Sequence, residues 1–343
     1  MKKYIAILCV LLPIYALCAD DYIPSVPTVT STRVTGMGGY HVTDTADYYT
    51  LFANPAGIPA VDGGGVLFNF DIKGGISDPT LLTEAIDIAG DMISAGGFDE
   101  SMISSDTLTG LIGDNGFNTG IELTGPLAFG TLYKNFGWGF FNKIYASAII
   151  PTISNMNVLA GTDFLLKFAY GAPIINTDNH YLSIGLSVEG FASLQSVYNG
   201  SPMTFISSMM SDSASSIEDS VPVYASAGMG FDAGILYKLY DIFSVGLVWN
   251  DFYTPVWIQD YTLSNIMNEE FSTSVSRFEV GESSLDVGIG IDIPFGFLDN
   301  ILDLVIMADY TDLLSIGDSL GRNPILNFSA GTELTLFKFL QLR

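Results

Sequence analysis

The segment VLAGTDFLLKFAY at positions 158–170 decides the fold, because its side chains separate by polarity at every second residue. The apolar set consists of Val158, Ala160, Phe164, Leu166, Phe168 and Tyr170. The alternate set contains Gly161, Asp163 and Lys167. A period of two residues is that of a β-strand, and charged side chains avoid lipid. The segment therefore predicts a strand with one face toward a bilayer and the other toward a water-filled lumen.

The same alternation recurs from Gly64 onward. It predicts strands near residues 64–76, 119–133, 137–150, 157–171, 181–198, 223–238, 242–250, 283–293, 301–312 and 324–336, with an eleventh beginning at Phe339. Most of them reach the roughly 9–11 residues that a tilted strand needs to cross a bilayer. The longest connections, at 77–118, 199–222 and 251–282, all fall on one side, as external loops do. We therefore expect an all-β fold, an antiparallel transmembrane β-barrel at 63–343.

Composition excludes several other classes of protein. Hydrophobic residues make up 48% of the chain and charged residues 14%, against about 25% charged residues in soluble domains. After residue 19 no uninterrupted apolar stretch of about 18 residues occurs, so membrane-spanning helices are not expected. The net charge of −25 repels nucleic acid and makes divalent cations the natural counterions of the acidic loops.

Residues 1–19 have the pattern of a secretory signal peptide. Two lysines precede an apolar core at 5–17, and small residues for cleavage occur at 16–19. Together with the predicted barrel, this signal predicts a protein of the cell outer membrane. Both cysteines, Cys9 and Cys18, lie in this segment, so neither a disulfide nor a thiolate metal site is expected.

The stretch at 20–62 lacks strand periodicity and contains GMGGYHVTDTADYYTLFANPAGI at positions 36–58. Its glycines are a weak match to a phosphate-binding loop, since no strand precedes them and no Lys-Ser/Thr pair follows. The run resembles the N-terminal hatch of the long-chain fatty-acid outer-membrane transporter family and of its less characterised bacterial relatives. The matching hatch residues are Gly38, Gly39, Ala46, Asp47, Asn54, Pro55, Ala56 and Gly57.

The resemblance implies a barrel of fourteen strands that is plugged by the hatch at 20–62. It also implies ligand capture at external loops and release sideways into the membrane. Only about eleven strands are predicted here, and an antiparallel barrel of this type needs an even number. We therefore expect the chain to be truncated at its C-terminus. The hatch itself either gates the lumen or serves as a purely structural plug.

The long connections supply the candidate ligand-binding surface. Apolar residues in 77–118 recur at helical spacing and predict a short amphipathic helix that needs an apolar partner. Methionines in 199–222 offer an adaptable second surface. The ligand-binding candidates are Leu82, Ile86, Met92, Ile93, Met203, Phe205 and Met209. The alternative is that these loops pack only against each other.

Charge limits the ligand that such a surface could bind. The 77–118 connection holds eight acidic residues and no Lys or Arg. A neutral or cationic hydrophobe therefore fits it at least as well as a fatty-acid carboxylate does. An anion could instead be helped inside the lumen by Lys73, Lys143 and Lys167, whose positions place them on the predicted inner face.

Enzymatic chemistry is not expected. The only histidines are His41 in the predicted hatch and His180 in a short turn, so a triad at the outer rim has no base, and no metal or cofactor site stands out. We predict a passive transporter for small hydrophobic molecules such as long-chain fatty acids, with outer-membrane lipid as its other partner. The alternatives are a surface platform that binds a protein partner through acidic loops, and a diffusion porin, whose lumen a hatch would obstruct.

Overall fold

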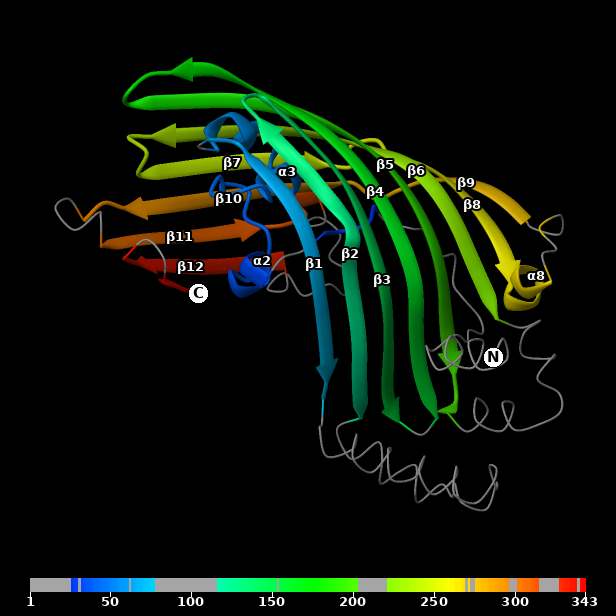
Figure 1. The fold of residues 1–343 in the computed structure, drawn as a ribbon. Coiled ribbons are helices and arrows are strands. Elements are labelled where there is room, and N and C mark those ends of the chain that lie inside the picture. Colours follow the sequence, from blue (N-terminus) through cyan, green and yellow to red (C-terminus); the bar gives the residue numbers. More distant parts are fainter. Residues whose placement is uncertain are drawn as a thin grey trace.

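The fold is a single antiparallel β-sheet that curls around the N-terminal part of the chain (Figure 1). The computed structural model describes residues 26–29, 32–61, 63–77, 116–152, 154–202, 221–268, 271, 275–295, 301–314, 327–337 and 340–343. Within these residues the sheet contains 13 strands, which confirms the all-β antiparallel prediction. No pairing between its two edge strands occurs among the described residues.

Each of the eleven predicted strands is present, with bounds shifted by a few residues. They are β1 (Gly65–Ile76), β2 (Phe117–Tyr133), β3 (Phe136–Thr152), β4 (Asn155–Asn176), β5 (His180–Gly200), β6 (Pro222–Leu239), β7 (Phe243–Asn250), β10 (Ser284–Ile293), β11 (Leu302–Tyr310), β12 (Phe328–Leu336) and β13 (Leu340–Leu342). Neighbours along the chain pair with one another, except that β7 pairs with β10.

The region expected as an external loop at 251–282 has a different structure. It contains two further strands, β8 (Pro255–Thr262) and β9 (Val275–Val280), and the short helix α8 (Leu263–Met267). Strand β8 pairs with the first half of β6, whereas β7 pairs with its second half. Residues 251–254 therefore form a break in the strand path between β7 and β8. The β8–β9 hairpin adds two strands to the same sheet.

Strand length divides the sheet into two parts. Strands β2 to β6 are 17 to 22 residues long, whereas β7, β10, β11 and β12 have only 8 to 10 residues. In Figure 1 the long strands sweep away from the short ones toward the end that carries the long connections. The opposite end carries the short connections, such as 134–135 and 240–242.

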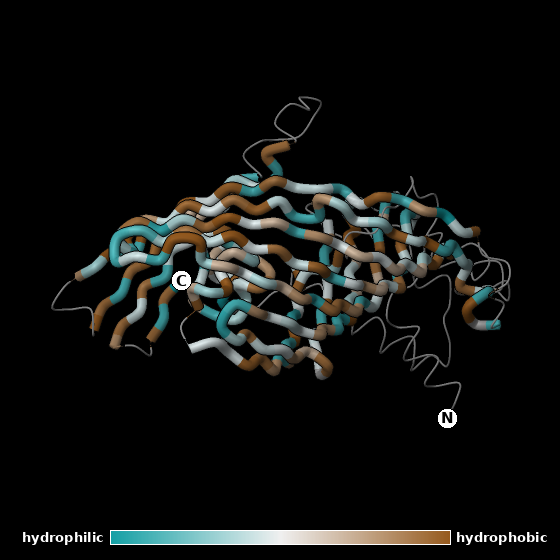
Figure 2. The backbone as a smooth tube through the Cα atoms, turned by 90° about the horizontal axis from the view of Figure 1, so that it is seen from above, coloured by the Kyte–Doolittle hydropathy of each residue, from teal (hydrophilic) through white to brown (hydrophobic). Residues whose placement is uncertain are grey.

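The two faces of the sheet have opposite polarity, and the apolar face is the outer one. On β1, alternate residues Val66, Phe68, Phe70 and Ile72 have exposed fractions between 55% and 86%. Charged residues on the inner face are buried instead, with Asp163 at 6%, Lys167 at 5% and Glu189 at 3% exposure. Apolar and polar residues alternate along the strands in Figure 2. Such an apolar outer surface is stable only against lipid or another apolar phase.

The N-terminal segment, residues 26–29 and 32–61, lies against the inner face of the sheet (Figure 1). It contains α2 (Thr32–Gly36), α3 (Thr50–Ala53) and the 3-10 helix η1 (Pro55–Ala60). Leu51 and Ile58 pack with wall residues such as Phe141 and Leu165 in one buried cluster. Within the part of the chain that the structure describes, none of the helices has the length and apolar character needed to cross a bilayer.

Glycines on the inner face let this segment approach the wall closely. A Cβ atom at Gly171 of β4 would lie 2.6 Å from the Pro55 carbonyl oxygen, and one at Gly246 of β7 would lie 2.6 Å from Val42 Cγ1. A Cβ atom at Gly185 of β5 would collide with the backbone of Pro55 and Ala56. Any larger residue at these positions would displace the segment, because interiors are close-packed.

Candidate functional site

The N-terminal segment is fixed to β11 through His41. Its Nδ1 atom forms a very short contact with the Asp309 carboxylate, and its Nε2 atom lies 2.8 Å from the Met37 carbonyl oxygen. The Val42 amide donates to the second Asp309 oxygen at 2.8 Å. Burial opposes protonation of His41, but the hydrogen bonds to Asp309 and Met37 outweigh it, so the pKa of His41 is raised above 6.5.

Arg33 of α2 ties the same segment both to itself and to β12. Its guanidinium donates to Asp44 at 2.5 Å and to Glu333 at 3.1 Å, and it lies 3.5 Å from Asp47. The predicted hatch residue Asp47 thus faces a cation, but burial raises its pKa overall. Bidentate guanidinium pairs of this kind fix orientation as well as distance.

The Asn-Pro-Ala-Gly motif forms the turn into η1. The Asn54 side chain accepts from the Ala56 amide at 2.9 Å and donates to Val42 O at 3.0 Å and to Ile235 O of β6 at 3.2 Å. Ser183 of β5 donates to Ala56 O at 2.6 Å. Pro55 occupies the first position of η1, where a missing N–H costs nothing. The motif therefore joins the segment to β5 and β6.

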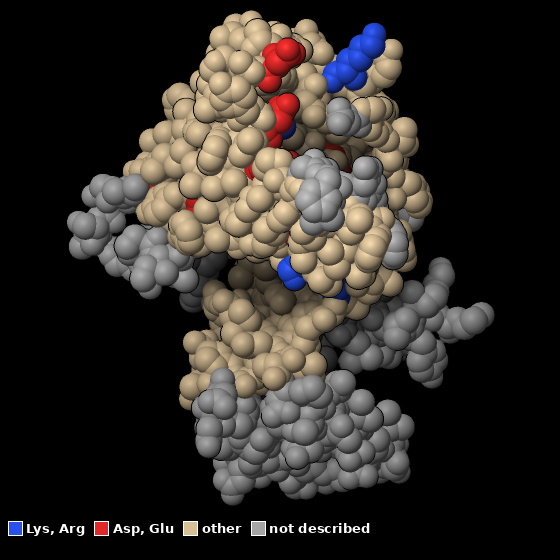
Figure 3. Space-filling model, turned by 90° about the vertical axis from the view of Figure 1, so that its left-hand side faces the viewer, with Lys and Arg blue, Asp and Glu red and all other residues tan. Residues whose placement is uncertain are grey.

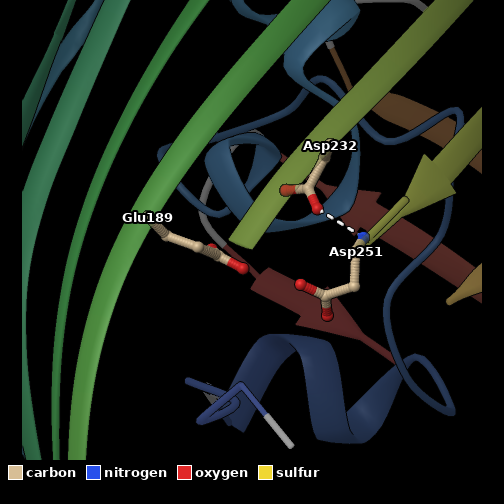
Figure 4. Close-up of side chains that lie close together, drawn as sticks. All are labelled: Glu189, Asp232 and Asp251. Atoms are coloured by element: carbon tan, nitrogen blue, oxygen red, sulfur yellow. Dashed lines mark hydrogen bonds between the residues drawn. The ribbon is translucent and has the colours of Figure 1, made fainter. Parts of the chain in front are cut away.

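A buried charged cluster lies on the inner face beside the break between β7 and β8. Lys167 Nζ is 2.8 Å from Glu189 Oε2 and 2.7 Å from Asp232 Oδ2. Asp232 also accepts from the Asp251 amide at 2.9 Å (Figure 4). Figure 4 shows the three carboxylates of Glu189, Asp232 and Asp251 turned toward one another. Lys167 Nζ lies 5.7 Å from the centre of the Phe52 ring, so the cluster also contacts the N-terminal segment.

Cavity A, of about 600 Å³, lies on the inner face toward the long-connection end. The chain at Val26–Thr28 forms one side, and strands β1 to β5 form the rest. Its charged and polar lining residues are Thr28, Lys73, Glu122, Lys143, Tyr145, Ser147, Asp163, Ser193 and Gln195. Next to it along β3 and β4, Phe141 and Leu165 are buried against the N-terminal segment, so this cavity ends at the segment's core.

Cavity B lies at the short-connection end and consists of two adjoining pockets of about 570 and 370 Å³. Both pockets are lined by Ala46, Asp241, Ile242, Asp292, Asp303 and Glu333. The face of the molecule at this end is mostly uncharged, with a few acidic and a few basic side chains (Figure 3). No residue lines both cavity A and cavity B, because the N-terminal segment separates them.

The structure places the predicted hatch residues at several points along the N-terminal segment. Gly38 and Gly39 have φ angles of 84° and 128°, which only glycine adopts without strain, directly after α2. Ala46 lines cavity B, and Asn54 to Gly57 are buried against β4, β5 and β6. The predicted ligand-binding residues Leu82, Ile86, Met92, Ile93, Met203, Phe205 and Met209 lie outside the described residues.

Other features of the site were not anticipated from the sequence. Lys73 and Lys143 do line cavity A, and Lys167 is buried on the inner face, as predicted. Their carboxylate partners, and the pairing of His41 with Asp309, were not predicted. The sequence does indicate which residues of each strand face inward. It does not indicate the stagger between strands, which decides which inward residues of different strands lie next to one another.

Comparison with known proteins gives resemblances of low identity. No family model matches the chain, and no curated protein matches it. The CymD monoaromatic hydrocarbon channel is similar, with a TM-score of 0.37 and 14% identity over 81% of this chain and 67% of that one. The toluene transporter TodX of Pseudomonas putida has a TM-score of 0.34 and 12% identity over 80% and 68%.

The outer membrane protease OmpT from Escherichia coli is also similar, with a TM-score of 0.26 and 8% identity over 57% of this chain and 69% of that one. At these values the resemblances do not assign a function, which has to come from the chain's own residues.

Proposed function

We propose that the protein is a passive transporter of the outer membrane that admits small hydrophobic molecules through its lumen. The observation that carries this proposal is the inverted polarity of the sheet, with apolar residues outside and charged residues buried inside. In this proposal the bilayer surrounds the wall, and the polar inner face provides a passage across the bilayer.

In this proposal the N-terminal segment is the hatch. Cavity A receives the molecule from the long-connection side, and the core around Phe141, Leu165 and Phe52 stops it from moving straight through. A passage is then completed only when the segment or the wall moves. An open diffusion pore does not fit this arrangement, since the described segment fills the lumen between the two cavities.

Uptake into lipopolysaccharide-containing vesicles tests the proposal, with radiolabelled toluene and radiolabelled oleate as probes. Entry of either probe faster than into vesicles without protein supports transport. Entry of neither probe overturns it and favours the surface platform. Deletion of 77–118 tests the loop that was expected to capture ligand, and unchanged uptake would remove that loop from the mechanism.

A variant pair tests cavity A directly. A Cβ atom at Gly75 meets no atom within 4 Å, so Gly75→Phe places a ring in cavity A without a clash at its base. Gly65 is also open, on the same strand and face, but does not line the cavity. We expect slower uptake in Gly75→Phe and wild-type uptake in Gly65→Phe. Equal uptake in both variants would place the route elsewhere.

A further inference from the structure

The two lysines that line cavity A already have carboxylate partners. Lys73 Nζ lies 3.0 Å from Glu122 Oε1, and Lys143 Nζ lies 3.6 Å from Asp163 Oδ2. Asp71 Oδ2 lies 3.5 Å from Lys73 Nζ and adds a third acid beside the cavity. A ligand carboxylate would have to displace one of these acids before it gained an ion pair. Cavity A therefore does not favour an anion.

An ammonium group already lies against an aromatic ring in the same cavity. Lys143 Nζ is 5.0 Å from the centre of the Tyr145 ring, and the Asp163 carboxylate accepts from the Tyr145 hydroxyl at 3.5 Å. The negative face of an aromatic ring attracts a cation, and a neighbouring carboxylate adds to that attraction. The Lys143 side chain is flexible, so a ligand ammonium has the same two groups to bind when this side chain turns away.

Cavity B has more acids than cations. Its lining cations are Arg33 and Lys238, and its lining acids are Asp44, Asp241, Asp292, Asp303 and Glu333. Arg33 pairs with Asp44 and Glu333. Asp292 shares a hydrogen bond with Asp303, which accounts for one proton. Acids still outnumber cations among these described residues once that proton is counted.

The excess of acids gives the passage a negative field. Cavities lined by one sign of charge between low-dielectric walls concentrate the opposite ion. The connection at 77–118, with eight acidic residues and no Lys or Arg, adds charge of the same sign to the chain. Apolar contact is also present, because Val26, Pro27 and Leu159 line cavity A, whose volume is about 600 Å³. A small apolar molecule with a positive head fits this combination.

We propose that the passage is selective by charge and admits hydrophobic amines, protonated or quaternary, in preference to hydrophobic anions of the same size. This inference rests on the proposed function and specifies its ligand class. Tyr145 and Asp163 hold the cationic head in cavity A, and the acids of cavity B attract it toward the short-connection end.

Uptake into lipopolysaccharide-containing vesicles tests the inference with two radiolabelled probes of similar shape. Phenyltrimethylammonium is a cation and benzenesulfonate is an anion, and each carries a tetrahedral head on one phenyl ring. Rates are taken relative to vesicles without protein. We expect the cation to enter at least about tenfold faster than the anion, the lower end of the effect of a charged cavity. The ratio of the two rates should fall in about 1 M salt, where the Debye length is only about 3 Å.

Two variants test the two cavities. Asp241→Asn with Asp303→Asn removes two charges from cavity B without adding bulk, and asparagine tolerates the positive φ of 54° at position 241. Tyr145→Leu removes the aromatic face from cavity A. Both should lower the ratio. Asp178→Asn is the matched control, because Asp178 is exposed at the short-connection end and lines neither cavity, so its ratio should equal that of the wild type.

Absence of any preference for the cation in the wild type overturns the inference. A ratio that is unchanged in the double variant or in Tyr145→Leu, or that falls equally in Asp178→Asn, also overturns it. Radiolabelled tert-butylbenzene, the neutral isostere of the cation, separates the two proposals. Its entry without entry of the cation overturns the inference and leaves the proposed function intact, whereas entry of none of the three probes overturns both. The wild-type ratio and its salt dependence decide the matter even if a variant does not fold.

Discussion

Replacing Lys167 with methionine tests how far the charged cluster stabilises the lumen. Lys167, Glu189 and Asp232 have side chains that are 6%, 3% and 4% exposed, so water cannot screen their charges. Lys167→Met keeps most of the length of the side chain but leaves two buried carboxylates without a cation, and the Asp251 carboxylate is close to both. Breaking a buried ion pair on one side costs about 3–5 kcal/mol. The ratio of folded to unfolded protein should thus fall by roughly two to three and a half orders of magnitude.

Urea unfolding in lipid vesicles, followed by fluorescence of the three tryptophans, measures this loss. The matched comparison is the triple variant Lys167→Met, Glu189→Gln, Asp232→Asn, in which no charge of the three remains. Because neutral side chains remove the unpaired charge, we expect the triple variant to regain most of the lost stability. The reasoning is wrong if Lys167→Met is as stable as the wild type, or if the triple variant is no more stable than Lys167→Met.

Three further predictions concern the N-terminal segment. Gly185→Ala should destabilise the protein by about 1–3 kcal/mol, the usual cost of overpacking, and should make residues 26–61 more sensitive to protease. Gly190→Ala should have neither effect, because the added Cβ atom meets no atom within 4 Å. The pKa of His41 is raised, so its pairing with Asp309 stabilises the fold fully below about pH 6.5 and loses this effect as the pH rises through the raised pKa. The free energy of unfolding of the wild type should therefore fall over that pH window. An equal fall in His41→Gln would refute His41 as the origin of the pH dependence. In the double variant Thr43→Cys, Gly290→Cys the two Cβ atoms lie about 3.3 Å apart, near disulfide geometry. If the N-terminal segment must leave β10 during transport, oxidation should stop uptake and reduction should restore it. Full uptake by the oxidised protein would show that the segment does not have to leave β10.

The strands could be predicted because lipid and water impose opposite requirements on alternate residues. Strand β8 escaped this rule, since its inner residues Val256 and Ile258 are apolar and fully buried in the core of the N-terminal segment. Its faces therefore do not differ in polarity as those of a strand between lipid and water do. Strand β9 alternates, with Phe278 outside and Arg277 less exposed, but it has only six residues, fewer than a bilayer-spanning strand needs.

The cluster around Lys167 could not be predicted, although its members were placed on the inner face. Lys167 and Asp232 are 65 residues apart and sit on strands that are not adjacent. Their distance depends on the stagger of β4, β5 and β6, which alternation alone does not specify. The Asn-Pro-Ala-Gly motif was found by its resemblance to the hatch of the fatty-acid transporter family, and Asn54, Pro55 and Ala56 act within a single turn.

The ion pair between Arg33 and Glu333 joins residues 300 positions apart, and that between His41 and Asp309 joins residues 268 apart. Contacts so distant along the chain form late, because a large loop must close before they can. The N-terminal segment is synthesised early, whereas its partners on β11 and β12 are synthesised 268 to 300 residues later. Until β11 and β12 are in place the segment has no complete binding surface, so its docking reports that these two strands have formed.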